Sequence, residues 1–322
     1  MLKSGSPVLC IIGPTASGKT AVSLELAERL PKVEIISADS LAVYKYLNVG
    51  TAKPPEEVRK HIPHHLVDFL DPRERWSAYD FRKEALRLFY EMGIRGSFPI
   101  VVGGTGFYFD VLFHGIPAWG VPRNEGLRRV LERMKNEQLF ALLVDIDPNR
   151  AAKIGKGDRK RLIRALEIFF LTGRIPSERK VHHRTPQEFQ YLLVGISWEK
   201  EDLQRRIRER VEDMFCKGIV EEVAHLLDLG YRLPLPALEN FTYRPIVAFL
   251  EGKCSLAEAK EAIFRGTMVF VKRQMNWFRK MPITWFSSEG GNFRKLAERI
   301  SNFVMRYLEE GHKDGREATW KD

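Results

Sequence analysis

A short glycine-rich segment near the start of the chain restricts its fold more than any other feature. Residues 13–20 read Gly-Pro-Thr-Ala-Ser-Gly-Lys-Thr and match the pattern G-x-x-x-x-G-K-[ST]. The apolar run at 8–12 predicts a buried strand before this segment, and the pattern at 20–30 predicts a helix after it. A strand, a glycine-rich loop and a helix in this order form a phosphate-binding loop.

The residue types in this loop suit a phosphorylated ligand. Its glycines let the backbone turn tightly so that N–H groups point inward, and the helix N-terminus adds positive potential. Lys19 would neutralise phosphate oxygens, and Thr20 would place its hydroxyl on Mg²⁺. The loop predicts a diphosphate or triphosphate ligand but does not specify the reaction. The residues predicted to bind it are Gly13, Pro14, Thr15, Ala16, Ser17, Gly18, Lys19 and Thr20.

Short apolar runs and helical patterns alternate through the first 110 residues. The runs at 33–36 and 99–102 predict two more strands, and 77–92 predicts a helix. Apolar strands that alternate with helices indicate a parallel sheet covered on both faces. The predicted fold class is therefore α/β, with a P-loop NTPase-like parallel sheet as its core.

The sequence between residues 116 and 190 has a different character. Helical periods recur at 127–135, 138–144 and 160–172 among many basic residues, although 139–144 also fits a strand. We predict that 116–190 form a mainly helical insertion domain.

After the insertion the core pattern returns. A strand is predicted at 191–196, mainly helical sequence follows from 201 to 279, and a last strand is predicted at 283–286. A helix at 293–308 and a loose polar tail at 309–322 complete the prediction. The core domain would then comprise residues 1–115 and 191–322, including a helical C-terminal part.

Charge and cysteine content restrict the class of partner and the compartment. The 322 residues carry a formal net charge of +10, which favours a polyanionic partner, although solvated Lys and Arg would also account for it. Cys10, Cys216 and Cys254 form no C-x-x-C pair, so we expect no zinc site, no disulfide framework and a cytoplasmic location. No signal peptide is evident, and no apolar run of about 18 residues predicts a membrane span.

Two further polar groups follow predicted strands. Asp39 follows the strand at 33–36, at the sheet edge where ligands bind, and would serve as a general base, a Mg²⁺ ligand or a helix N-cap; we favour catalysis. Thr105 stands in the Gly-rich sequence after the strand at 99–102 and would direct its hydroxyl into the same crevice. His64 and His65 cannot both face one site in a strand, so capping or packing is the preferred interpretation.

Several segments, taken together and in order, resemble the tRNA dimethylallyltransferase (tRNA isopentenyltransferase) family. The resemblance covers roughly residues 8 to 286, and Gly50-Thr-Ala-Lys-Pro54 and Lys272-Arg-Gln274 are its most specific parts. The segments are 13–20, 37–40, 48–54, 63–68, 102–108, 161–167 and 272–279.

The resemblance implies an enzyme that transfers a dimethylallyl group from dimethylallyl diphosphate to N6 of adenosine 37, just 3′ of the tRNA anticodon. It implies that Lys19, Mg²⁺ at Thr20 and Arg210 stabilise the departing diphosphate. Asp39 would accept the proton of N6, and Thr105 would hold N6 in place. The adenine would have to leave its stack to enter the pocket. We also expect a monomer.

The resemblance further implies that basic helices hold the anticodon stem-loop. Lys160 and Arg164 share one helix face, and Lys272, Arg273, Asn276 and Arg279 form a polar stripe on another helix. The predicted RNA-binding residues are Asp39, Ser40, Leu41, Ala42, Lys160, Arg161, Leu162, Ile163, Arg164, Tyr243, Arg244, Lys272, Arg273, Gln274, Asn276 and Arg279. The chain departs from the family pattern at Ala42, at Lys160, at 241–245 and at 267–270, which we expect to lie on RNA-facing elements.

Other functions fit parts of the sequence. A prenyltransferase for free adenine nucleotides would not need the large basic C-terminal half. A P-loop kinase would consume ATP, but no arginine-rich nucleotide lid is evident. A non-catalytic RNA-binding protein would dispense with Asp39 and Thr105, and both are present.

Overall fold

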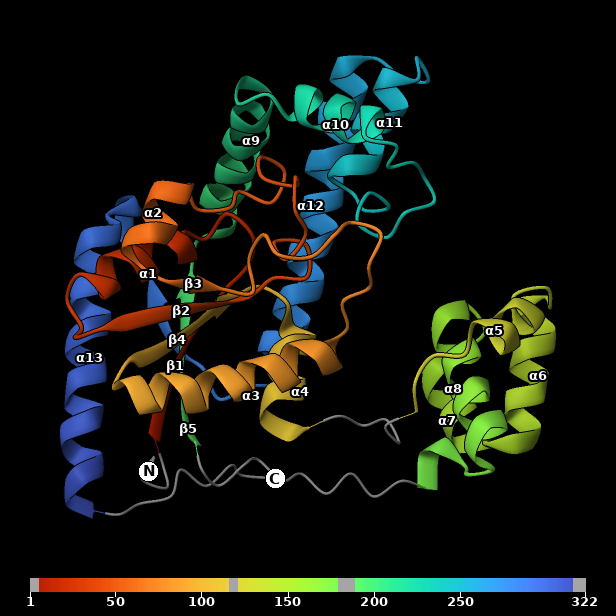
Figure 1. Ribbon diagram of the computed structural model, residues 1–322, viewed down its shortest axis with the longest axis horizontal. Coiled ribbons are helices and arrows are strands. Elements are labelled where there is room, and N and C mark those ends of the chain that lie inside the picture. The colour runs from red at the N-terminus through yellow and green to blue at the C-terminus, as the bar shows by residue number, and fades with distance from the viewer. Residues whose placement is uncertain (1–5, 116–120, 179–188, 315–322) are drawn as a thin grey trace. The chain divides into compact units, whose positions relative to one another are not determined.

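The computed structural model describes residues 6–115, 121–178 and 189–314 (Figure 1). The chain divides into two compact units, one formed by Met1–Phe113 with Thr185–Asp322 and the other by His114–Arg184. We call them the core unit and the insertion unit. Each is described by itself.

The core unit is built on a parallel sheet whose strands follow the order β3-β2-β4-β1-β5-β6. Because all strands run in one direction, their carboxyl ends meet at one edge, where open α/β sheets bind ligands. The strands are β1 Ser6–Ile12, β2 Val33–Ala38, β3 His64–His65, β4 Phe98–Gly103, β5 Phe189–Ser197 and β6 Thr284–Ser287.

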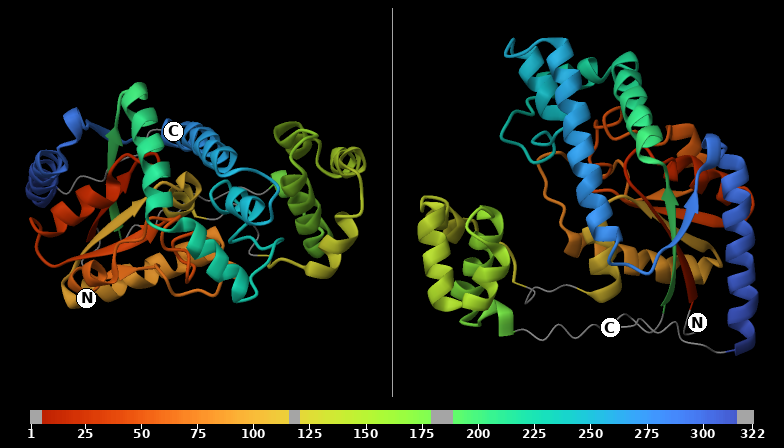
Figure 2. Two further views of the ribbon diagram at one scale, coloured as in Figure 1. Left: turned by 90° about the horizontal axis from the view of Figure 1, so that it is seen from above. Right: turned by 180° about the vertical axis from the view of Figure 1, so that it is seen from behind.

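Helices cover both faces of this sheet (Figures 1 and 2). On one face, Leu26 of α1 and Ile300 of α13 pack on Leu9 and Ile11 of β1. On the other face, α3, α4 and the end of α12 pack on the alternate residues of the same strands. The helices of the core unit are α1 Lys19–Ala27, α2 Glu56–His61, α3 Ala78–Arg95, α4 Gly106–His114, α9 Lys200–Cys216, α10 Ile219–Asp228, α11 Tyr243–Leu250, α12 Leu256–Phe278 and α13 Phe293–Asp314.

A second apolar cluster lies beyond the sheet edge and fixes the loop that follows β2. Leu47 from this loop, Val223 of α10, Tyr243 of α11 and Ile263 of α12 are almost fully buried together. The helix α12 therefore contributes to both clusters, since its Phe278 belongs to the core over the sheet. The loop after β2 is held by tertiary packing and not by regular secondary structure.

The insertion unit is a helical unit with its own apolar core. Its helices are α5 Glu125–Leu131, α6 Asn136–Ile146, α7 Pro148–Ile154 and α8 Arg159–Thr172. Leu162 and Ile163, which we predicted to bind RNA, are buried in this core at 0% and 4% exposure, so their side chains pack inside the unit and do not present a surface to RNA. They face Leu139 and Leu143 of α6 because they lie on the apolar side of α8.

The buried Glu167 of α8 ties the insertion unit together. Its carboxylate pairs with Arg128 at 2.8 Å and Arg164 at 2.6 Å, and it accepts the Asn124 N–H at 2.8 Å. Burial opposes ionisation of Glu167, but these partners outweigh it and hold its pKa at about 2. Arg164, a predicted RNA-binding residue, is therefore engaged inside this network.

The predicted strands and most predicted helices are confirmed. The ambiguous segment at 139–144 is helical, within α6, and residues 309–314 of the predicted loose tail continue α13; residues 315–322 lie outside the described part. The two-residue strand β3 and the helices α2, α4 and α7 were not predicted. Within the described residues, no helix has the length and apolarity that crossing a membrane requires.

Candidate active site

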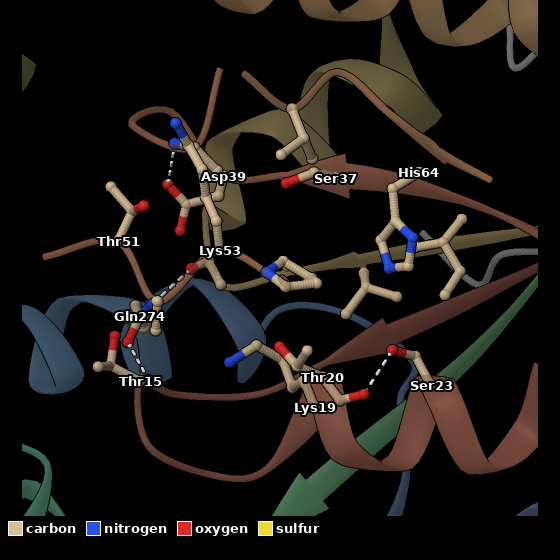
Figure 3. Close-up of a pocket in the computed structure, with 18 residues that line it drawn as sticks. Thr15, Lys19, Thr20, Ser23, Ser37, Asp39, Thr51, Lys53, His64 and Gln274 are labelled. Carbon is tan, nitrogen blue, oxygen red and sulfur yellow. Dashed lines mark hydrogen bonds between the residues drawn. The ribbon is translucent and has the colours of Figure 1, made fainter. Parts of the chain in front are cut away.

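A pocket opens at the carboxyl edge of the sheet, between the glycine-rich loop and the loops after β2 and β4 (Figure 3). Its empty volume is about 630 Å³, part of which is open to solvent. Polar side chains from segments far apart in the sequence therefore meet in one cavity. The residues that line it are Thr15, Lys19, Thr20, Ser23, Ile35, Ser37, Asp39, Ala42, Thr51, Ala52, Lys53, Pro54, His64, Val67, Val102, Gly103, Gly104 and Gln274.

The glycine-rich loop has the tight turn that its sequence predicts. Gly18 has φ +89°, and the Ser17 N–H donates to Pro14 O at 3.2 Å. The C-terminal elements hold the loop from outside, because Trp198 Nε1 donates to Ser17 O and Arg206 Nε to Ala16 O, both at 2.9 Å. These contacts engage the carbonyls of Ala16 and Ser17 with donors that do not line the pocket, and the amides of such a loop suit an anion.

Lys19 and Asp39 line the pocket, and the buried Arg210 lies close enough to influence both electrostatically. Burial, and then repulsion from Arg210, lower the pKa of Lys19 to about 7, while Asp39 raises it. Lys19 Nζ donates to Pro14 O at 2.7 Å. Burial lowers the pKa of Arg210, and the Asp39 carboxylate raises it. The Nε of Arg210 is buried and has no hydrogen-bond partner in the described residues. The structure thus brings the predicted residues Lys19, Asp39 and Arg210 together, with positive charge in excess.

Of the roles that its sequence position allowed, Asp39 makes the capping contacts, and its carboxylate also reaches the pocket. Its Oδ1 accepts the N–H groups of Leu41 at 2.8 Å and Ala42 at 3.3 Å, so it caps the turn after β2. Its carboxylate also lines the pocket beside Thr51 and Lys53 (Figure 3). The capping contacts fix the orientation of a carboxylate that faces a ligand site.

The glycines after β4 allow α12 to approach the sheet edge closely. A Cβ on Gly104 would lie 2.2 Å from Gln274 Nε2, and one on Gly106 would lie 2.4 Å from Trp277 Cβ. Thr105 stands between them, partly buried at the start of α4. It is not among the described residues that line this pocket, so its predicted contact with N6 stays a prediction.

Gln274, a predicted RNA-binding residue, makes its contacts inside the protein. It is 3% exposed, accepts the Thr15 N–H at 2.9 Å and donates to Gly104 O at 2.9 Å. A side chain whose polar atoms are used inside the protein in this way is not available to an RNA backbone. Polarity alone did not separate it from its exposed neighbours Lys272 and Arg273, whereas its spacing from Val271 and Phe278 places it on the buried side of α12.

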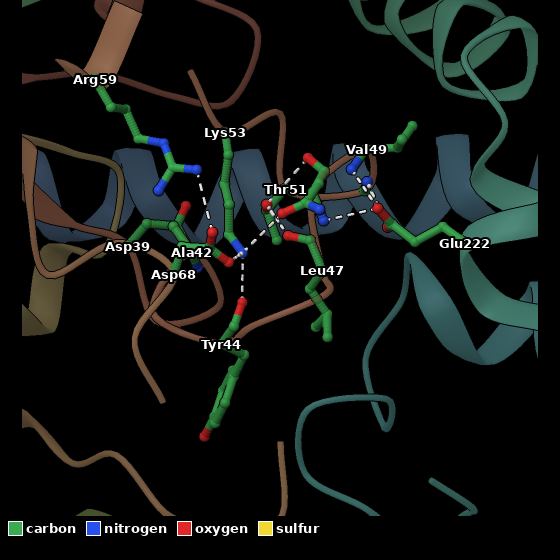
Figure 4. Close-up of polar contacts among 12 residues, drawn as sticks. Asp39, Ala42, Tyr44, Leu47, Val49, Thr51, Lys53, Arg59, Asp68 and Glu222 are labelled. Carbon is green, nitrogen blue, oxygen red and sulfur yellow. Dashed lines mark hydrogen bonds and ion pairs between the residues drawn. The ribbon is translucent and has the colours of Figure 1, made fainter. Parts of the chain in front are cut away.

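The loop at 48–50 is held by a single carboxylate (Figure 4). Glu222 accepts the N–H groups of Asn48 at 2.7 Å, Val49 at 2.6 Å and Gly50 at 3.2 Å, and the Tyr243 hydroxyl at 2.9 Å. Tyr243, a predicted RNA-binding residue, is fully buried, and its hydroxyl is engaged by Glu222 and not presented to solvent. The sequence offered no signal for Glu222, because three of its partners are backbone N–H groups at least 172 positions away, whose identity no side chain reveals.

Lys53 and Asp68 connect the same loop to the segment after β3 (Figure 4). The Lys53 ammonium donates to Asp68 at 2.8 Å and to Asn48 Oδ1 at 3.1 Å, and also contacts Tyr44 O. Arg59 pairs with the other oxygen of Asp68 at 3.1 Å. Lys53 therefore uses its donors to fix the pocket wall that Thr51 and Pro54 complete.

The histidine pair separates as the strand geometry predicts. His65 contacts Glu34 at 2.7 Å, whereas His64 lines the pocket and its Nδ1 contacts Ile62 O at 2.6 Å. Burial lowers the pKa of His64. Packing explains His65, but the position of His64 in the pocket was not predicted.

The remaining predicted RNA-binding residues differ in exposure. Ala42 is 7% exposed and lines the pocket, so this departure from the family pattern lies inside the candidate site. Thr267 is also buried, and its hydroxyl donates to Ile263 O. Ser40 and Leu41 are partly buried. The exposed ones are Lys160, Arg161, Arg244, Lys272, Arg273, Asn276 and Arg279.

The donor set near the glycine-rich loop bears on the predicted Mg²⁺. The described residues contain no group of three or more His, Cys, Asp or Glu side chains that could hold a metal by themselves. Thr20 is exposed at the pocket, next to the loop amides. This arrangement suits Mg²⁺, which keeps several waters and binds through few protein oxygens together with the phosphates of a ligand.

Comparison with known proteins agrees with this geometry. The family model of IPP transferase matches residues 42–281. The tRNA dimethylallyltransferase of Geobacter sulfurreducens is 41% identical, and the match covers 95% of this chain and 98% of that protein. The tRNA dimethylallyltransferase of Geobacter metallireducens is 43% identical, and the match covers 92% of this chain and 97% of that protein.

Solved structures of similar fold give the same result. The tRNA isopentenylpyrophosphate transferase of Bacillus halodurans has a TM-score of 0.71 at 35% identity and covers 96% of this chain and 98% of its own. A eukaryotic dimethylallyltransferase, described as acting on tRNA, has a TM-score of 0.80 at 25% identity over 99% of this chain and 87% of its own. The chain therefore belongs to the tRNA dimethylallyltransferase family of IPP transferases.

Proposed function

We propose that this protein transfers the dimethylallyl group of dimethylallyl diphosphate to N6 of adenosine 37 in tRNA. The observation that carries the proposal is a pocket lined by Lys19, Asp39 and residues of the glycine-rich loop, with the buried Arg210 near enough to act electrostatically on Lys19 and Asp39. The cations suit a diphosphate, and the carboxylate suits an amine that must lose a proton. The similarity to enzymes named tRNA dimethylallyltransferase supports the same reaction.

The leaving group explains the cations. When the bond between the allylic carbon and the diphosphate oxygen breaks, negative charge grows on that oxygen. Loop amides, the Lys19 ammonium and the Arg210 guanidinium stabilise this charge in a preorganised site. The buried, unpartnered Nε of Arg210 supports this role, because such a donor gains most from an incoming oxygen.

The acceptor explains the carboxylate. Adenine N6 is a weak nucleophile because its lone pair is delocalised into the ring. As N6 forms its bond to the allylic carbon, the proton of N6 passes to Asp39, and diphosphate leaves with the electron pair of the broken C–O bond. Thr105 would orient N6 from the loop after β4. The adenine enters the pocket after leaving the stack of the anticodon loop.

Mg²⁺ fits this site through the Thr20 hydroxyl and the oxygens of the bound diphosphate. When bound, the ion would neutralise charge on the leaving group. Lys19 and Arg210 act on the same oxygens from the protein side.

The exposed basic residues suit an RNA backbone. Lys160 and Arg161 of the insertion unit, with Lys272 and Arg273 of the core unit, present positive charge to solvent. Phosphate contacts of this kind position the RNA without reading its sequence. We propose that they bind the anticodon stem-loop, and that the enzyme works as a cytoplasmic monomer.

Two other reactions remain candidates. A kinase would need ATP in the glycine-rich loop with its terminal phosphorus aimed at a hydroxyl. A prenyltransferase for free adenine nucleotides would use the same pocket without the exposed basic residues. The family of the chain and those residues favour the tRNA reaction.

An incorporation assay separates these reactions. The protein is incubated with Mg²⁺ and labelled dimethylallyl diphosphate, together with tRNA, AMP or ATP plus a nucleoside. The proposal predicts label in tRNA at an adenosine next to the anticodon and release of pyrophosphate. Label in AMP alone, or ATP turnover without label transfer, contradicts it.

A further inference from the structure

The loop that holds the diphosphate and the segment that carries Thr105 are joined through one buried side chain. Gln274 of α12 accepts the Thr15 N–H and donates to Gly104 O, each at 2.9 Å. Figure 3 shows Gln274 at the pocket wall, hydrogen-bonded to Thr15. We propose that Gln274 is a positioning residue that sets the phosphate loop against the acceptor side of the pocket.

The chemistry of both contacts requires a carboxamide in one orientation. Its oxygen meets an N–H, and its NH₂ group meets a carbonyl. If the amide were reversed, oxygen would face oxygen and nitrogen would face nitrogen, so both contacts would be lost. A residue that satisfies two backbone groups of different loops in this way fixes the distance between them.

The residues around Gln274 pack closely against its carboxamide. Gln274 is 3% exposed. Gly104 has no side chain, and a Cβ there would lie 2.2 Å from Gln274 Nε2 and 3.3 Å from Gly13 O. The three segments thus meet closely, and a larger residue at 104 would displace the carboxamide.

The position of this contact connects it to both substrates. Thr15 belongs to the loop that binds the diphosphate, and Gly104 directly precedes Thr105. Relaxing the contact lets the two loops move independently, which separates the leaving group from the acceptor amine. Misplacement of about 1 Å in an active site costs on the order of 10²-fold in rate.

The inference rests on the proposed function, and its test distinguishes a failure of the role proposed for Gln274 from a failure of the proposed reaction. Gln274→Met keeps the volume and removes both hydrogen bonds. We expect kcat to fall by about 10- to 100-fold and the KM for dimethylallyl diphosphate to rise, with the KM for tRNA unchanged. Thr267→Val, a buried polar site on the same helix whose hydroxyl contacts only Ile263 O, should leave these values near those of the wild type.

Gln274→Glu supplies a pH signature that a merely structural role would not produce. The protonated carboxyl is an isostere of the amide, since its C=O accepts and its O–H donates. Once ionised it repels Gly104 O and the diphosphate, and burial raises the pKa of such a carboxyl. The ratio of mutant to wild-type activity should therefore be highest at acidic pH and fall as pH rises.

Binding of inorganic pyrophosphate with Mg²⁺, measured by calorimetry, does not depend on transfer. We expect it to weaken about tenfold in Gln274→Met. If Gln274→Met does not fold, Gly104→Ala disturbs the same contact from the other side and should have the same effect. The inference is overturned if Gln274→Met keeps kcat and pyrophosphate affinity while its KM for tRNA rises. If wild-type protein binds pyrophosphate but transfers no label to tRNA, the proposed function fails instead.

Discussion

Arg210 of α9 acts on Lys19 of the glycine-rich loop from 191 positions away in the sequence, by the difference of their residue numbers. Burial, and then this repulsion, lower the pKa of Lys19 to about 7. A cationic site held at this cost in the free protein favours the arrival of an anion. Because protonation of Lys19 and anion binding are thermodynamically linked, the number of protons taken up on binding can be measured.

We predict that diphosphate binding takes up a proton at pH values above about 7. The free protein loses the Lys19 proton as pH rises through its pKa of about 7, whereas a bound diphosphate restores it. Affinity for pyrophosphate should therefore fall by up to about tenfold per pH unit above 7. Calorimetry in buffers of different ionisation enthalpy measures the uptake directly.

Lys19→Arg is the matched control for this titration, because a guanidinium stays protonated throughout the range. Subtracting its pH profile removes the titration of pyrophosphate itself. Equal proton uptake by wild type and Lys19→Arg would show that the lowered pKa has no part in binding.

Two substitutions of Asp39 separate its base role from its capping role. Asp39→Asn keeps an oxygen that can accept the Leu41 N–H, so we expect a stability near that of the wild type. Transfer should fall by about 10²- to 10⁴-fold because an amide cannot take the N6 proton. Pyrophosphate affinity should hold or rise, since a negative charge is removed.

Asp39→Ala should lose transfer to the same degree and also about 1 kcal/mol of stability through the lost cap. Urea unfolding and single-turnover incorporation measure the two effects. An Asp39→Asn protein with full activity would remove Asp39 as the base.

Glu222 should control the order of the loop at 48–50. Glu222→Gln weakens the contacts with three backbone N–H groups and the Tyr243 hydroxyl, and we expect a loss of about 1–3 kcal/mol. Tyr243→Phe removes only the phenol contact and should cost about 1 kcal/mol. Hydrogen exchange measures this effect, and the amides of residues 48–50 should exchange faster in Glu222→Gln than in the wild type. Unchanged protection of these amides would refute the role assigned to Glu222.

The insertion unit should lose stability in acid through Glu167. Its folded pKa of about 2 lies below the ordinary value of 4.5, so its contribution is present above pH 4.5 and is lost as pH falls toward 2. Glu167→Gln should remove this pH dependence and destabilise the unit by about 3–5 kcal/mol, since Arg128 and Arg164 lose their partner. Hydrogen exchange of α5 and α8 between pH 5 and 3 measures both the pH dependence and the loss of stability in Glu167→Gln. If the protection of the wild-type unit does not change over this range, Glu167 does not cause the predicted acid destabilisation.

Local sequence patterns predicted the sheet and the glycine-rich loop well because those elements depend on nearby residues. The strand before Gly13 and the helix after it are marked by apolar period and by the loop motif. The strand β3 was missed because two residues, His64 and His65, form too short a pattern, and its pairing with β2 is set by tertiary contacts.

The part of the site that depends on local patterns was also predicted from the sequence. Lys19 and Asp39 follow strands, so the topology of a parallel sheet places them at one edge, and Arg210 came from the family resemblance alone. The family resemblance implied RNA contacts for Gln274 and Tyr243, whereas their burial depends on which side of α12 or α11 faces the core. Glu222 binds backbone amides, which carry no side-chain identity that a sequence pattern could match.

The most direct measurement is a crystal structure of the protein with a non-reactive thio analogue of dimethylallyl diphosphate, Mg²⁺ and an anticodon stem-loop RNA. We predict the diphosphate against the amides of residues 16–20 with Lys19 and Arg210 on its oxygens, and the adenine N6 within hydrogen-bond distance of Asp39. A diphosphate bound elsewhere, or an N6 that faces away from Asp39 while the allylic carbon lies beside it, would contradict the account.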